Sequence, residues 1–139
     1  MYIKNRLVIY LLYTFFCFAL TGATVSLDIP RGIAESLNKG NSRDLARHFN
    51  INIELVILDN EDVYSKSQAE LILRNFFSVN KPVKFEVLHQ GGKESSRYAI
   101  GNLETNKGNF RIYFLLKRSN GDSLIHLLRI EPVEGNTRP

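Results

Sequence analysis

His126 is the residue of this chain best placed for acid–base chemistry. It interrupts an apolar row, and a hairpin pairing would put Tyr113 and Leu128 near it on one face of a sheet. A buried imidazole with a phenol nearby could move a proton or bind a polar ligand group, because burial and neighbouring charges tune the pKa of a histidine. The other interpretation is a histidine in a subunit interface, or a core histidine bonded to the backbone. His126 and Tyr113 are therefore candidates for a ligand site or an interface.

Further residues extend the same candidate surface. Tyr98 could line a pocket, although a tyrosine in a strand more often packs its ring and leaves its hydroxyl at an edge. Leu115 and Leu128 fall on the same predicted hairpin face and are candidates for an interface. Arg129 and Glu131 are two residues apart in a predicted strand, so they share a face and are expected to form a charge pair rather than a catalytic pair.

The acidic run near residue 60 does not have the pattern of a calcium site. A calcium-binding loop starting at Asp59 would put Glu61 and Glu70 at its third and twelfth positions. Val63 and Tyr64 stand where such a loop needs an oxygen ligand and a glycine, so the match fails. The sequence also lacks a thiol pair, a two-histidine helix motif, a nucleophile elbow and a phosphate-binding loop. We therefore expect no metal, no cofactor and no catalytic constellation.

A hairpin over residues 108–131 positions the candidate residues. Asn120-Gly121 favours a two-residue type I′ turn, because both central residues of that turn need positive φ. The turn sets a register with three facing pairs: Leu116 with Ile125, Phe114 with Leu127, and Ile112 with Arg129. One face would hold Phe110, Ile112, Phe114, Leu116, Ile125 and Leu127, and the other Tyr113, Leu115, Leu124, His126, Leu128 and Ile130. Because both faces are apolar, we expect something to cover each of them.

Helical and strand periods predict the remaining elements. Helices are expected between Pro30 and Gly40, over residues 43–49 with Ser42 as their cap, and from a Ser65–Gln68 capping box to about residue 80. Strands are expected over residues 51–57, 83–87 and 98–105, with loops over residues 59–62 and at residues 91–92. The order ααβαββββ predicts an α+β domain with its helices on one face of a single antiparallel sheet.

The N-terminal residues have the parts of a secretory signal peptide. Lys4 and Arg6 precede an uncharged apolar run over residues 7–20, and small residues lead to a cleavage point after Ala23. The alternative is a retained membrane anchor, since the chain stays uncharged to Leu27. We expect a signal peptide over residues 1–23, one domain over 24–133 and a loose tail over 134–139. The protein would be periplasmic or secreted, and would meet the membrane only through an uncleaved signal segment.

Charge and cysteine content exclude two classes of protein. The chain has 18 basic and 14 acidic residues, a net charge of +4, and Lys4 and Arg6 of the predicted signal segment supply part of it. The other basic residues are dispersed, so there is no electrostatic footprint for nucleic acid. The single cysteine, Cys17, lies in the predicted signal segment, so a disulfide framework is excluded for the mature domain.

Three stretches resemble one protein family. Residues 98–101 (Tyr-Ala-Ile-Gly), the run over 108–117 and residues 128–131 (Leu-Arg-Ile-Glu) are similar to uncharacterised exported proteins of Bacteroidetes-type bacteria, a domain of unknown function. The resemblance covers about residues 29–131 and implies a nuclear-transport-factor-2-like, or cystatin-like, cone, in which the helices pack on one face of a curved antiparallel sheet. Enzymes of the wider superfamily use an aspartate, histidine or tyrosine inside such a cone for proton transfer. The family itself carries no established activity.

These observations leave three hypotheses for function. The first is an exported, non-catalytic binding or interaction module, homodimeric through the outer sheet face, with a possible small-molecule ligand. The second is an isomerase, dehydratase or hydrolase of small molecules with His126 and Tyr113 in the cone pocket. The third is a scaffold subunit of an envelope complex. The missing catalytic constellation favours the first hypothesis over enzymatic activity.

Overall fold

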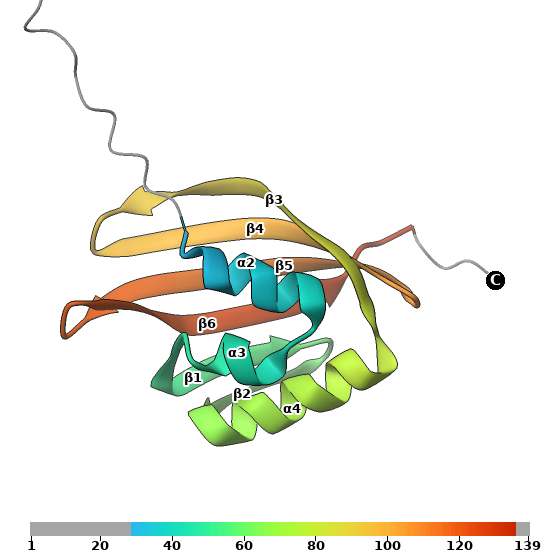
Figure 1. The fold of residues 1–139 in the computed structure, drawn as a ribbon, viewed down its shortest axis with the longest axis horizontal. Coiled ribbons are helices and arrows are strands. Elements are labelled where there is room, and N and C mark those ends of the chain that lie inside the picture. The colour runs from blue at the N-terminus through green and yellow to red at the C-terminus, as the bar shows by residue number, and fades with distance from the viewer. Residues whose placement is uncertain (1–28, 136–139) are drawn as a thin grey trace, which may run out of the picture.

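The computed structural model describes residues 29–135, which form three helices and one six-stranded sheet. Figure 1 shows the helices on a single face of that sheet. The elements are, in chain order, α2 (Arg31–Lys39), α3 (Ser42–Ala46), β1 (Phe49–Ile57), β2 (Asn60–Ser65), α4 (Lys66–Val79), β3 (Pro82–Lys93), β4 (Ser96–Thr105), β5 (Gly108–Ser119) and β6 (Asp122–Pro132). The predicted α+β architecture and element order are confirmed, with β2 as an added short edge strand where the sequence predicts a loop.

The strands follow the order β2-β1-β6-β5-β4-β3. Neighbouring strands are antiparallel except for β1 and β6, which are parallel. The first and last strands of the described chain therefore lie side by side, and this long-range pairing joins the β1–β2 hairpin to the four-stranded meander (Figure 1).

Local sequence explains where each helix begins and ends. α2 follows Pro30 and ends at Gly40, whose φ of 64° is the left-handed conformation that glycine adopts most easily. α4 begins with the predicted capping box, in which the Ser65 hydroxyl accepts from the Gln68 amide and the Gln68 side chain accepts from the Ser65 amide. α3 is capped by Asn41 and not by Ser42 as expected; Asn41 Oδ1 accepts from the Asp44 amide at 3.0 Å.

The core lies between the helices and the inner face of the sheet. It is one cluster of buried side chains that are all apolar: Ile33, Leu37, Leu45, Ala46, Phe49, Ile53, Leu55, Ile57, Ala69, Leu73, Phe76, Phe77, Phe85, Ala99, Leu103, Phe110, Ile112, Phe114, Leu116, Ile125, Leu128 and Ile130. On β4, Gly101 is packed against the Phe85 ring, and a Cβ at that position would collide with the ring. Among residues 29–135, the buried polar side chains are Ser36, Ser42 and Thr105, and none of them is an acid or a base.

The hairpin of β5 and β6 has the predicted turn but a different register beyond it. Asn120 and Gly121 have φ values of 50° and 87°, and Leu116 pairs with Ile125 as expected. Leu115 then pairs with Leu127, so His126 is an extra residue on β6, which is a β-bulge.

The bulge reverses the faces predicted for the second half of β6. Phe114 pairs with Leu128, and Ile112 pairs with Ile130, whereas the simple register pairs them with Leu127 and Arg129. Leu128 and Ile130 are completely buried in the core. The predictions that both lie on the second face, and that Leu127 lies on the core face, are therefore wrong.

Gly91 and Gly92 are also placed differently from the prediction. They lie within β3, paired with Tyr98 and Arg97, and not in a loop. A Cβ at Gly91 would come within 2.8 Å of the Tyr98 hydroxyl. Glycine at this position therefore leaves room for the Tyr98 ring to lie across the neighbouring strand.

Candidate functional site

The sheet face that the helices leave uncovered is the candidate site, and we call it the outer face. Its side chains follow from the strand pairings, because paired residues share a face. Its apolar and aromatic members are Val63 on β2, Val56 on β1, Leu124 and Leu127 on β6, Tyr113 and Leu115 on β5, Tyr98 and Ile100 on β4, and His89 on β3. Val56 is buried, the members on β6, β5 and β4 are half-buried, and Val63 and His89 are exposed.

Aromatic rings form a row across three strands of this face. The rings of Tyr113 and Tyr98 are stacked, with centroids 6.2 Å apart and an interplanar angle of 24°. His89 continues the row, its ring centroid 6.2 Å from that of Tyr98. Such rings combine a large apolar area with a polar edge, the composition favoured in protein interfaces.

A shallow hollow of about 290 Å³ lies beside this row. Ile100, Tyr113 and Leu127 form its apolar lining, and Arg111 and Arg129 complete it. Arg129 Nη1 lies 3.4 Å from Glu131 Oε1, so the expected charge pair is present. The hollow is thus apolar in its middle and basic at its border.

His126 is separated from the hollow by its place in the bulge. With Leu127 it opposes Leu115, which lies on the outer face. Its Nε2 atom is buried and has no hydrogen-bond partner among the described residues. Burial lowers the pKa of His126, and the nearby Lys117 cation lowers it further, so the imidazole is neutral at pH 7.

The structure therefore brings together only some of the predicted site residues. Tyr98, Tyr113 and Leu115 lie together on the outer face. His126 borders them across the bulge but does not line the hollow with Tyr113. Leu128 lies in the core, and its place on the outer face is taken by Leu127.

Sequence reasoning missed Leu127 and Ile100 in this surface. Ile100 could have been found from strand alternation once the β4–β5 turn was placed. Leu127 could not, because nothing in the local sequence marks His126 as an extra residue.

Two kinds of feature are absent from the part of the chain that the structure describes. Between residues 29 and 135, no cluster of three or more histidine, cysteine, aspartate or glutamate side chains could hold a metal ion. Over the same range, no helix has the length and apolar character needed to cross a bilayer. The predicted signal peptide and residues 136–139 of the predicted tail lie outside the described residues.

Comparisons with known proteins identify the family. Residues 30–131 match the model of DUF4783, a domain of unknown function. A DUF4783 protein of Bacteroides fragilis is 39% identical, with a TM-score of 0.72 over 76% of this chain and 100% of that chain. One from Bacteroides ovatus is 32% identical, with a TM-score of 0.74 over 78% and 98% of the two chains. No curated protein matches the chain.

More distant structures agree in fold alone. A domain of unknown function with a cystatin-like fold from Nostoc punctiforme is 12% identical, with a TM-score of 0.59 over 74% of this chain and 72% of that chain. Similar structures also include a nuclear-transport-factor-2-like chain. The predicted family and the predicted fold are both confirmed: this chain belongs to the DUF4783 family, a domain of unknown function with a nuclear-transport-factor-2-like fold.

Proposed function

We propose that this protein is an exported, non-catalytic interaction module that pairs with a second copy of itself through the outer face. One observation carries the proposal: all the described helices cover the inner face, while the opposite face presents an apolar and aromatic surface that no described element covers. An apolar sheet face that no other element covers is typical of protein interfaces.

The size of the outer face supports a dimer. Six strands about 4.8 Å apart make a face about 24 Å wide, and the ten residues of β4 span about 33 Å. The resulting area, about 800 Å², is what each partner contributes to a protein–protein interface of standard size. A single twofold axis would let the same surface serve both copies.

The composition of the face also supports this proposal. Tyr98, Tyr113, Leu115 and Leu127 provide the apolar centre that interfaces need. The hollow beside Tyr113 could receive a side chain from the partner, with the Arg129–Glu131 pair at its polar border.

Analytical ultracentrifugation of the exported protein tests the proposal. We expect the wild-type protein to sediment as a dimer and the Leu127→Lys variant to sediment as a monomer. The matched control is Leu71→Lys, because Leu71 is 54% exposed on α4, on the helical side of the domain. A wild-type protein that stays monomeric at high concentration, or a Leu127→Lys variant that stays dimeric, would contradict the proposal.

The alternative of an isomerase, dehydratase or hydrolase working inside the cone gains no support from the geometry. That function requires His126 and Tyr113 to face the helices. Tyr113 faces the other way, and the buried polar side chains of the described residues, Ser36, Ser42 and Thr105, include no acid or base.

Export rests on the signal pattern of residues 1–23. N-terminal sequencing of the protein purified from the envelope fraction tests it. The expected first residue is Thr24, whereas a chain that still begins at Met1 would support the retained anchor.

A further inference from the structure

A second hollow lies on the helical side of the domain, away from the outer face. It has a volume of about 550 Å³ and is bordered by α3, β1 and the start of α4. Its lining consists of Arg43, Ala46, Arg47, Ile51, Ser65, Lys66, Ser67 and Glu70. This volume is within the usual range of small-molecule sites, which combine an apolar lining with a few polar groups.

The apolar part of this hollow is built by an irregularity in β1. Phe49 pairs with Ile125 and Glu54 pairs with Leu127, so residues 50–53 of β1 lie opposite only one residue of β6. Ile51 lies in this bulged stretch and is 79% exposed, which is the highest value among the exposed large apolar residues. Ile51 therefore offers an exposed apolar side chain to a ligand in this open hollow.

The charges around the hollow are mostly positive. Three cationic side chains, Arg43, Arg47 and Lys66, line it together with one carboxylate, Glu70. Glu70 is held by Arg74 at 2.9 Å. Among the described residues, Arg43 and Lys66 have no ion pair, so their charges are available to a ligand.

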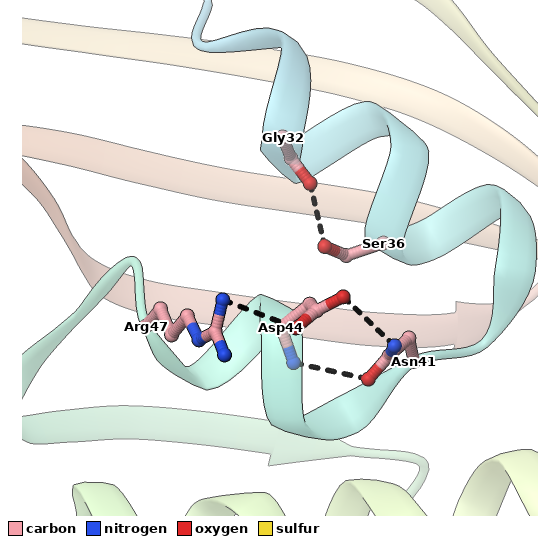
Figure 2. A network of polar contacts seen from close by, with 5 residues as sticks. All are labelled: Gly32, Ser36, Asn41, Asp44 and Arg47. Atoms are coloured by element: carbon pink, nitrogen blue, oxygen red, sulfur yellow. Dashed lines mark hydrogen bonds and ion pairs between the residues drawn. The ribbon is translucent and has the colours of Figure 1, made fainter.

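Arg47 is part of the polar network shown in Figure 2. Asn41 caps α3 and donates from Nδ2 to Asp44 Oδ2 at 2.8 Å. Arg47 Nη1 lies 3.6 Å from the other oxygen of Asp44, and the Arg47 side chain remains 72% exposed. The pairing is loose enough for Arg47 to add to the positive potential of the hollow.

The behaviour of His48 agrees with this potential. Burial lowers the pKa of His48, and the cations Lys66 and Arg47 lower it further, while Asp44 opposes them. The start of α4 does not offset the positive charge, since its first turn contains no acidic residue.

We propose that this hollow binds an aliphatic carboxylate, with the hydrocarbon chain packed against the exposed side chain of Ile51 and the carboxylate held by Arg43 and Lys66. Ile51 favours an apolar chain, and the cations without ion-pair partners favour a negative head group. The site is independent of the outer face, so it does not depend on the proposed dimer.

Isothermal titration calorimetry with dodecanoate, below the concentration at which it forms micelles, tests the inference. We expect the wild-type protein to bind dodecanoate, and the Arg43→Gln/Lys66→Gln variant to bind at least about tenfold more weakly, since it loses charge-assisted contacts. Ile51→Ser should also weaken binding. The control, Lys81→Gln, removes an exposed cation outside the hollow and should leave the affinity unchanged.

Further titrations show whether an aliphatic carboxylate is the wrong class of ligand. Dodecyltrimethylammonium has the same chain with a positive head group, and equal binding of this cation would overturn the inference. So would an unchanged affinity of the double variant, or no binding of dodecanoate. Sedimentation with anionic lipid vesicles without binding of free dodecanoate would overturn it in favour of a membrane surface. If dodecanoate binds as expected, its negative charge raises the pKa of His48. NMR chemical shifts of the His48 ring, followed over a pH titration, measure this change.

Discussion

Replacing Leu128 with alanine should destabilise the domain by about 3–4 kcal/mol, whereas the same change at Leu127 should cost the folded monomer less than about 1 kcal/mol. The two leucines are neighbours in β6 with the same chemistry, and they differ only in the face on which the bulge puts them. Leu128 is completely buried in the core, and Leu127 is half-buried at the outer face.

The magnitude for Leu128 follows from its surroundings. It packs in the core opposite Phe114 and beside Leu55, which are 0% and 1% exposed. Truncation to alanine removes three carbons, worth about 0.8 kcal/mol each on transfer from water. A residual cavity of about 50 Å³ adds about 1 kcal/mol at about 24 cal/mol per Å³. For a domain of this size, the loss lowers the melting temperature by more than about 12 °C.

Urea unfolding followed by circular dichroism measures both variants. The experiment is run at two protein concentrations, because dissociation of a dimer would add a concentration-dependent loss to Leu127→Ala but not to Leu128→Ala. Equal losses of unfolding free energy for the two variants at the lower concentration, or a larger loss for Leu127→Ala, would refute the bulged register and the outer face derived from it.

Three further predictions concern single residues. Burial, and then the Lys117 cation, lower the pKa of His126 from 6.5 in the folded protein. As the pH falls, His126 therefore takes up its proton in the unfolded chain before it does so in the folded protein. The stability that depends on His126 is full above about pH 6.5 and declines below it. Urea midpoints at about pH 5 and pH 7 should show a smaller decline for His126→Asn than for the wild type, and equal declines would contradict this. Gly101→Ala should lower the melting temperature, because the new Cβ collides with the Phe85 ring; an unchanged value in a thermal scan would show that the ring can move. Ser65→Ala should cost about 1 kcal/mol in urea unfolding through loss of the α4 cap, and no loss would mean that the capping box adds nothing.

Much of the fold could be predicted because its signals are local. Pro30 and Gly40 mark the two ends of α2, and the Ser65–Gln68 capping box marks the start of α4. Asn120-Gly121 identified the hairpin turn. Each of these signals depends on backbone preferences of a few adjacent residues, which one sequence is enough to reveal.

The parts that could not be predicted depend on distant partners. The parallel pairing of β1 with β6 joins segments about 70 residues apart, and no local pattern specifies it. β2 has six exposed or half-exposed residues without apolar alternation, so it resembles a loop in sequence. The bulge at His126 puts Leu127 on the outer face and Leu128 in the core, which is the reverse of the predicted arrangement. The candidate site residue Leu128 therefore does not lie at the site.

Isotope-filtered NMR on a dimer that mixes labelled and unlabelled copies tests the central claim most directly, because it detects contacts between the copies only. The account predicts intermolecular contacts of the Leu115 and Leu127 methyl groups with residues of the outer face. Contacts arising instead from Leu71 and the other exposed residues of α4, or no intermolecular contacts at any concentration, would contradict it.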